Sequence, residues 1–170
     1  MANLKKNFSD ALEFVNNKVC FVRCDLNLPI VDNKITDFTR LDEIIPTLEK
    51  LISRNGKIIL ISHLGRPKGK VDENLSLEMM IPHIEERLKR SIVFCKEQIL
   101  SSETAEKIKK LPPKGVLLLE NIRFYKQEEE NDKKFSSKIS EYGDIYINET
   151  FSTSHRNHAS ITGISSFLPS

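Results

Sequence analysis

The stretch 57-KIILISHLGRPKGK-70 decides the fold, because it changes character halfway along. Residues 58–61 are branched and apolar with no polar alternation, which is typical of a strand buried on both faces. His63, Gly65 and Arg66 follow almost at once. The stretch therefore predicts a buried strand that delivers a histidine and an arginine to one end of a sheet.

Apolar runs alternate with helical patterns along the chain. The runs are 18-KVCFVRCDL-26, 57-KIILIS-62, 91-SIVFC-95, 115-GVLLLENI-122 and 144-DIYINETF-151. Between them, apolar residues recur at helical spacing over 41–52, 77–88 and 135–142, which gives each helix one apolar face. This order favours right-handed crossovers and a parallel sheet. We expect an α/β fold of three layers, α/β/α, with helices on both faces of the sheet.

Glycines and prolines mark the expected element ends. Gly56, Gly115 and Gly143 each precede an expected strand, where glycine would adopt the left-handed conformation that ends the preceding segment. Pro46 and Pro82 fall inside the first two helical patterns. Because proline removes a backbone donor, we expect a kink or a later helix start at each.

Length and charge narrow the class of protein. The chain has 170 residues, 39% hydrophobic and 29% charged, which fits a single domain over 1–170 or a piece of something larger. A formal net charge of +2 is too small to argue for a nucleic-acid partner. The chain shows neither a secretory leader nor an apolar run of membrane-spanning length. We expect a cytoplasmic protein with no membrane contact.

The cysteines and one charge-dense segment are interpreted as structural features. Cys20, Cys24 and Cys95 fall in expected strands, and an odd number without metal-type spacing favours buried thiols in a reducing cytosol over a zinc site or a redox pair. The charge-dense segment 126–134 is interpreted as a solvated loop that enters a helix.

Charged and polar residues gather where the expected strands end. Parallel strands point their carboxyl ends at one edge of the sheet, where ligands bind. These residues are Asp25, Asn27, Arg40, His63, Arg66, Asn121, Arg123, Asn148, Glu149, His155, Arg156 and His158. Arginine binds carboxylate and phosphate by two-point contacts, so the set predicts a site for a small, highly anionic ligand. Taken singly, each has an alternative: a surface salt bridge for an arginine, a structural hydrogen bond for a histidine, a turn cap for Asp25.

Several nucleotide and nucleophile motifs are missing. The chain has neither G-x-x-x-x-G-K-[ST] nor G-x-G-x-x-G, and no serine or cysteine in a nucleophile elbow. Its six glycines are not clustered to cradle a nucleotide. The sequence thus favours a small acid over ATP as the ligand, with Gly65 and Pro67 forming a turn that aims Arg66.

These residues lie in segments that resemble the N-terminal domain of phosphoglycerate kinase. The matching stretches are 22-VRCDLNLP-29, 35-ITDFTRL-41, 61-ISHLGRPKG-69, 117-LLLENIRF-124 and 148-NETFSTSHRNHAS-160. The resemblance implies a Rossmann-like lobe of a two-lobed monomer. That enzyme moves a phosphoryl group between 1,3-bisphosphoglycerate and MgADP, giving 3-phosphoglycerate and MgATP. The N-terminal lobe holds the glycerate, and the C-terminal lobe holds the nucleotide with its Mg²⁺.

The resemblance also implies residue roles. Asp25 and Asn27 would bind the hydroxyl and glycerate end of the substrate. Arg40 would face the carboxyl end and act as the catalytic residue that stabilises the phosphoryl group in flight. The phosphate at the other end would be bound by His63, Arg66, Arg123 and Arg156, with His155 and His158 in support. No residue of this chain is expected to bind a metal or a cofactor.

The last matching segment departs from the family pattern, which usually reads close to NDAFGTAHRAHAS. Glu149, Thr150, Ser152, Ser154 and Asn157 replace aspartate, alanine, glycine, alanine and alanine. Serine in place of glycine is expected to stiffen or shift the loop that carries Arg156.

The chain ends at 164-ISSFLPS-170, where the family continues into the nucleotide lobe. We therefore expect weak 3-phosphoglycerate binding, no catalysis by this chain alone, and exposed apolar surface near Phe167 and Leu168. The alternative is a stand-alone anion-binding or interaction module with the same fold, but such a module has little need of Arg40. A nucleic-acid binder is disfavoured, because stacking aromatics are scarce at the basic edge.

Overall fold

The apolar side chains of the sheet divide between two cores, one on each face. In strand β4 (Lys57–Ile61), Ile58 and Leu60 belong to one core, whereas Ile59 and Ile61 belong to the other. The strand is buried on both faces, as its unbroken apolar run predicts. These positions come from a computed structural model, which describes residues 8–150 and 156–169.

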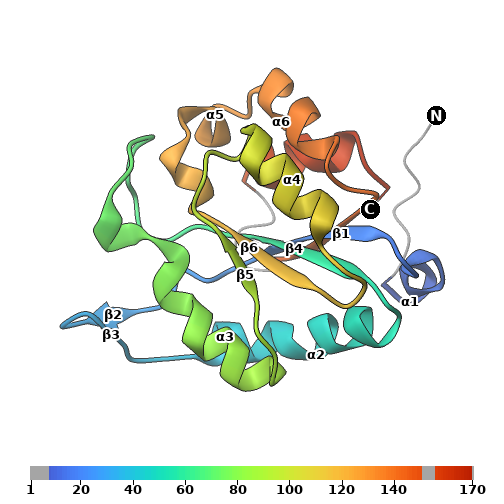
Figure 1. Cartoon of the computed structure of the whole chain (residues 1–170). Coiled ribbons are helices and arrows are strands. Elements are labelled where there is room, and N and C mark those ends of the chain that lie inside the picture. Colours follow the sequence, from blue (N-terminus) through green and yellow to red (C-terminus); the bar gives the residue numbers. More distant parts are fainter. Residues whose placement is uncertain (1–7, 151–155, 170) are drawn as a thin grey trace.

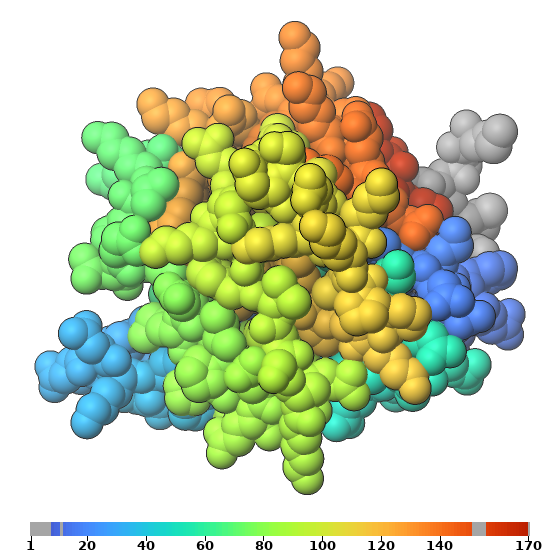
Figure 2. Space-filling model, viewed as in Figure 1, coloured from blue at the N-terminus to red at the C-terminus, as the bar shows by residue number. Residues whose placement is uncertain are grey.

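In the described part of the chain, five parallel strands form the sheet in the order β5-β6-β4-β1-β7 (Figure 1). The other four are β1 (Val19–Cys24), β5 (Val93–Cys95), β6 (Val116–Leu119) and β7 (Ile145–Glu149). An antiparallel hairpin of β2 (Ile30–Val31) and β3 (Lys34–Ile35) stands apart from the sheet. In the space-filling view, this hairpin and the loop after β4 project from the same side of the molecule (Figure 2).

Helices cover both faces of the sheet (Figure 1). On one face, α2 (Thr39–Ser53) and α3 (Ile81–Leu88) contribute to the same core as Ile58. On the other, α4 (Ser102–Lys110) and α6 (Lys133–Ser140) contribute to the core that contains Ile59. This arrangement confirms the expected three-layer α/β/α fold with a parallel sheet.

Shorter elements connect these layers. They are α1 (Phe8–Ala11), α5 (Lys126–Glu129), a π-helical turn at Ala159–Gly163, and 3-10 turns at Leu12–Phe14, Glu73–Leu75, Leu77–Met80, Ile122–Phe124 and Ile164–Ser166.

The two prolines behave differently. A 3-10 turn occupies Leu77–Met80, and α3 begins only at Ile81 with Pro82 in its first turn, so the later start is confirmed. Helix α2 instead begins at Thr39 and runs through Pro46 as one element, so no later start occurs there.

Helix α4 was not predicted, because only Thr104 and Ile108 are buried along it and its apolar stripe is too short to stand out. The side chain of Ser101 caps it by accepting a hydrogen bond from Thr104 N at 3.2 Å.

The role expected of the three glycines is wrong. None of the three has a positive φ; beside Gly56 and Gly115, the left-handed conformation belongs to Asn55 and Lys114, with φ of 62° and 66°. The glycines are needed for space: a Cβ at Gly143 would lie 2.3 Å from Phe21 Cδ2, and one at Gly56 would lie 2.8 Å from Val15 Cγ1. Close packing of loop against strand selects glycine here.

The interpretation of 126–134 as a solvated loop is also wrong in part. Residues 126–129 form α5, and the side chain of Glu128 is fully buried. The sequence gives no sign of this, because Glu128 stands among exposed charged neighbours. By contrast, the cysteines Cys20, Cys24 and Cys95 are buried free thiols as expected.

At the end of the described chain, Phe167 is 47% exposed, whereas Leu168 is buried in the second core. The expectation of exposed apolar surface therefore holds for Phe167 and is wrong for Leu168. Within 8–150 and 156–169, no helix is both long and apolar enough to cross a membrane.

Candidate anion-binding site

Strand order brings the polar strand ends together. Strand β4 lies between β1 and β6 in the sheet, so the segments that follow these three strands are neighbours at the carboxyl edge. They carry Asp25 and Asn27 after β1, His63 after β4, and Arg123 after β6. The polar and charged side chains expected at the strand ends are thus brought together at one edge of the sheet.

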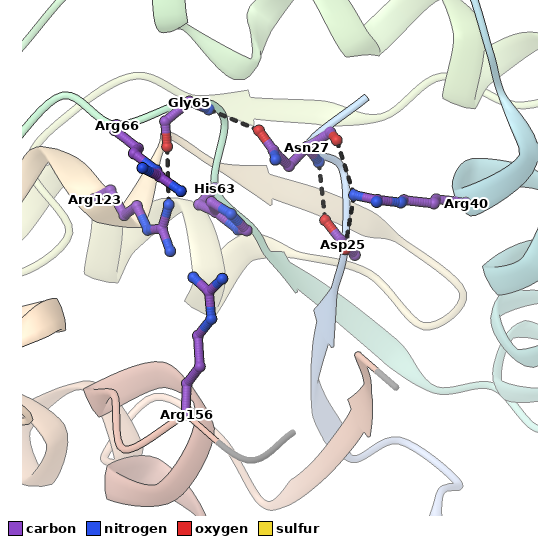
Figure 3. Close-up of a pocket in the computed structure, with 8 residues that line it drawn as sticks. All are labelled: Asp25, Asn27, Arg40, His63, Gly65, Arg66, Arg123 and Arg156. Carbon is purple, nitrogen blue, oxygen red and sulfur yellow. Dashed lines mark hydrogen bonds and ion pairs between the residues drawn. The ribbon is translucent and has the colours of Figure 1, made fainter. Parts of the chain in front are cut away.

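A pocket of about 270 Å³ occupies this edge (Figure 3). It gathers the seven residues to which the resemblance assigns substrate binding, together with Gly65, whereas Asn121, Asn148 and Glu149 of the wider strand-end set do not line it. The lining residues are Asp25, Asn27, Arg40, His63, Gly65, Arg66, Arg123 and Arg156. Of the two supporting histidines, His158 does not line the pocket, and His155 lies outside the described residues.

Hydrogen bonds between loops fix one side of the pocket. The side-chain oxygen of Asn27 accepts a hydrogen bond from Gly65 N at 2.8 Å, which ties the β1 loop to the β4 loop. Gly65 has φ of 63°, and a Cβ there would lie 2.7 Å from Leu75 Cδ2, so this turn favours a residue without a side chain. Behind it, Ser62 Oγ accepts from Leu26 N and donates to Cys24 O, both at 2.8 Å.

Asp25 caps a local turn and also pairs with Arg40. Its Oδ1 accepts from Asn27 N at 3.1 Å, which is the local turn cap. Its Oδ2 accepts from Arg40 Nη1 at 3.1 Å. Arg40 stands in the first turn of α2 and also donates to Asn27 O at 3.0 Å (Figure 3). The guanidinium group is therefore held against the β1 loop while its side chain stays 46% exposed.

Arg123 is held from the opposite side. Asn121 Oδ1 accepts from Arg123 N at 3.1 Å and caps the turn Ile122–Phe124. Arg123 Nη1 donates to Gly65 O at 2.9 Å, whereas its Nε has no hydrogen-bond partner among the described residues. Burial lowers the pKa of Arg123, but arginine stays protonated at neutral pH.

His63 is buried and contacts an arginine that sequence reasoning missed. Its Nδ1 lies 3.1 Å from Nη2 of Arg23, a residue of β1 that is only 1% exposed. Burial, followed by the nearby cations Arg23, Arg123 and Arg156, lowers the pKa of His63 from 6.5 to about 2. The positive charge of the pocket therefore comes from its arginines. An arginine inside the apolar run 18–26 was the signal that could have drawn attention to Arg23.

The pocket has the chemistry to hold a small anion. Its lining contains four arginines and one carboxylate, and that carboxylate is already paired with Arg40. No group of three or more histidine, cysteine, aspartate or glutamate residues gathers anywhere in 8–150 or 156–169. The lining offers guanidinium forks to phosphate and carboxylate rather than oxygen ligands to a divalent cation.

Similar sequences and structures agree on one family. The chain is 43% identical over 157 residues to the phosphoglycerate kinase of Finegoldia magna, covering 92% of this chain and 40% of that protein. It is 46% identical over 156 residues to a protein of Triticum aestivum described as "Phosphoglycerate kinase, cytosolic", covering 91% and 38%. The chain thus spans about 40% of the length of the curated relatives it matches.

Two solved structures show the same fold. Phosphoglycerate kinase from Coxiella burnetii matches with a TM-score of 0.82 and 29% identity, covering 91% of this chain and 38% of that one. The enzyme from Pyrococcus horikoshii matches with a TM-score of 0.82 and 32% identity, covering 91% and 39%. The family model described as "Phosphoglycerate kinase" matches residues 10–170. Nearly the whole chain is matched, and it therefore belongs to the phosphoglycerate kinase family.

Proposed function

We propose that the pocket binds 3-phosphoglycerate and 1,3-bisphosphoglycerate, the two forms of the substrate on either side of phosphoryl transfer. The chain would then be the glycerate-binding lobe of a phosphoglycerate kinase. The observation that carries this proposal is the convergence of four arginines from separate segments on one cavity, with Asp25 and Asn27 beside them. Arginine forks suit a phosphate at one end of the ligand and a carboxylate at the other. Asp25 and Asn27 suit the hydroxyl between them.

In this proposal Arg40 is the catalytic residue. Among the described residues, its Nη1 donates to Asp25 and to the Asn27 carbonyl; the side chain lines the pocket and is 46% exposed. It can therefore turn toward a carboxyl-phosphate group whose charge grows as the phosphoryl group leaves. A contact that strengthens as charge develops lowers the barrier rather than merely tightening substrate binding.

The rest of the set would bind and orient the ligand. Arg66, Arg123 and Arg156 would surround the phosphate, with His63 as a further hydrogen-bonding partner and His155 and His158 in support. Phosphoryl transfer needs this positioning and charge neutralisation more than it needs covalent help from the protein.

The second substrate, a magnesium nucleotide, is proposed to bind a part of the family's sequence that this chain does not span. The cationic pocket is a poor site for Mg²⁺, because its one carboxylate is paired with Arg40. We accordingly propose that this chain supplies one lobe, acts as a monomer, and catalyses no transfer without a nucleotide-binding partner lobe. A cytosolic location fits the description of the wheat relative and the free thiols.

The test is a titration of the chain with 3-phosphoglycerate and, separately, with MgATP, followed by backbone amide NMR. The proposal expects 3-phosphoglycerate to shift the amides of Asn27, Gly65 and Arg123, and MgATP to leave them unmoved. Glycerate without phosphate is the matched control ligand. The variant Arg54→Ala, at an exposed arginine just after α2, is the control protein and should bind normally.

Two results would change the assignment. No shift with 3-phosphoglycerate in a well-dispersed spectrum would refute the proposal. Equal affinity for inorganic phosphate and 3-phosphoglycerate would instead favour the stand-alone anion-binding module, because a kinase lobe must recognise the glycerate as well as the phosphate.

A further inference from the structure

Arg23 is a buried arginine near the carboxyl end of β1, the strand next to the one that leads to His63. Its three guanidinium nitrogens all have partners. Nε donates to Ser160 Oγ at 2.9 Å, Nη1 donates to Cys24 O, and Nη2 contacts His63 Nδ1 at 3.1 Å. A side chain bound at every nitrogen has one orientation, so Arg23 presents a fixed N–H group to His63.

The chemistry of arginine fixes the direction of the contact with His63. A guanidinium group has five N–H donors and no acceptor. The Nδ1 atom of His63 must therefore be the acceptor, with its lone pair toward Arg23 and its hydrogen elsewhere. A neutral imidazole whose Nδ1 accepts carries its hydrogen on Nε2. His63 lines the pocket, so Nε2 is the ring nitrogen left to donate to a ligand.

Behind Arg23, a buried carboxylate sets the geometry. Glu128 is fully buried, and its two oxygens accept from Ser160 Oγ at 2.6 Å and from Ser160 N at 2.8 Å. Because the Ser160 hydroxyl gives its hydrogen to Glu128, its lone pairs face Arg23 Nε. Tyr146 holds the same turn by donating to Ser160 O at 2.7 Å. The hydrogen bonds are donated outward from Arg23 on both sides, through Ser160 to Glu128 on one side and to His63 on the pocket side.

We infer that Arg23 is a positioning residue that locks His63 as a neutral Nε2–H donor, and that Glu128 and Ser160 orient Arg23 for this task. His63 then contributes one directional hydrogen bond to the anion and no charge. Besides Arg23, the groups that act on the ring are basic: Arg123 from the turn after β6, and Arg156 and His158 from the segment after β7, while Asp25, the carboxylate that lines the same pocket, is paired with Arg40. Each of these basic groups favours the neutral ring, and the low pKa of His63 agrees with it.

A neutral donor has a functional advantage beside several arginines. A cationic His63 would repel Arg23 in the protein interior, where charges interact strongly. The neutral ring avoids this repulsion and still supplies a hydrogen bond at a fixed point. It also keeps the affinity of the site independent of histidine protonation. Only the identity of the ligand rests on the proposed function; the state of the ring does not.

The test measures the ring directly in the chain without ligand. Long-range ¹H–¹⁵N NMR distinguishes a bare ring nitrogen from a protonated one, and the spectrum of His63→Gln identifies the His63 signals among the four histidines. We expect Nδ1 bare and Nε2 protonated throughout the range from about pH 5 to pH 8. A ring that becomes doubly protonated near pH 6.5, or that carries its hydrogen on Nδ1, would overturn the inference whether or not 3-phosphoglycerate binds.

Variants separate positioning from folding. Arg23→Lys keeps the charge but cannot bind Ser160 and His63 together, so we expect His63 to become a mixture of both tautomers in a folded chain. His63→Gln retains an N–H donor and should hold 3-phosphoglycerate within about threefold of the original affinity, whereas His63→Ala should lose about tenfold. If Arg23→Lys leaves a pure Nε2–H ring, Arg23 is not the group that sets the tautomer, and the assignment fails. If the chain does not fold with lysine, the tautomer in the unaltered protein still decides.

Discussion

The two sides of the pocket are built in opposite ways. The inner wall, which consists of residues 25–27, 63–65 and 121–123, is cross-linked by hydrogen bonds between loops, such as Asn27 Oδ1 with Gly65 N and Arg123 Nη1 with Gly65 O. The outer rim consists of Arg66 and Arg156, whose side chains make no hydrogen bond or ion pair with any other residue in 8–150 or 156–169.

The wall therefore gives the pocket its shape, whereas the rim adds positive charge that can move. The wall has its form before an anion arrives, so binding costs little reordering there. None of the described residues uses the donors of the rim arginines, which can turn toward a ligand. Arg40 is intermediate, because it is exposed yet bonded to Asp25. Substitutions in the wall should therefore change both stability and binding, whereas substitutions in the rim should change binding alone.

The largest effect is expected behind the wall, at Glu128. Glu128→Ala removes the buried acceptor of Ser160 and leaves Arg23 without the carboxylate that orients it. Loss of one partner of a buried charged network costs about 3 kcal/mol of unfolding free energy. Urea unfolding would measure it. Glu130→Ala, two residues along and exposed, is the control and should change the free energy by less than about 0.5 kcal/mol.

The next effect is on the wall itself, at Arg123. Arg123→Ala removes the bond to Gly65 O and one guanidinium fork from the pocket. A charged hydrogen bond contributes about 1.5–3 kcal/mol, so the affinity for 3-phosphoglycerate should fall about tenfold to a hundredfold. Isothermal titration gives the affinity, and thermal unfolding should show lower stability as well. Unchanged stability would mean that Arg123 belongs with the rim.

A dependence on pH follows from His63. Its pKa is about 2 in the folded chain and near 6.5 when unfolded, so below pH 6.5 the unfolded chain takes up a proton that the folded chain refuses. Stability is therefore lost as pH falls, by up to about 1.4 kcal/mol per pH unit from this group. Between pH 7 and pH 5, the unaltered chain should lose about 1–2 kcal/mol more than His63→Gln does. Parallel curves for the two proteins would show that the ring accepts a proton while folded.

The smallest effect is expected at the rim. Arg66 is exposed and its side chain has no partner among the described residues, so Arg66→Ala should leave the unfolding midpoint unchanged. Affinity for 3-phosphoglycerate should fall about tenfold, the value of one charge-assisted contact at an exposed site. The affinity of Arg66→Lys should lie between those of the unaltered chain and Arg66→Ala, because lysine keeps the charge but cannot make the two-point contact of a guanidinium group. A drop in stability would contradict the division between wall and rim.

The local sequence pattern predicted the residues that line the pocket but not the buried residues behind them. Asp25, His63 and Arg123 were identified because a polar residue directly after an apolar run is visible in the sequence. Glu128 and Arg23 were not, because a charged residue among charged neighbours, or one inside a strand, looks ordinary until its surroundings are known. The same limit applies to Gly143, which is required by contact with Phe21 rather than by its own backbone angle.

The sequence by itself determined the layers and the position of the ligand edge, because unbroken apolar runs and a period of 3.6 residues report burial locally, and all parallel strands end at one edge. Only the tertiary structure decided which of those residues touch. Arg23 meets His63 across 40 positions and Ser160 across 137, and both contacts depend on the strand order β5-β6-β4-β1-β7. Strand order is set by how the two cores close, which no window of neighbouring residues contains. The protonation state of His63 therefore depends on the tertiary contacts of its ring and not on the residues next to it in the sequence.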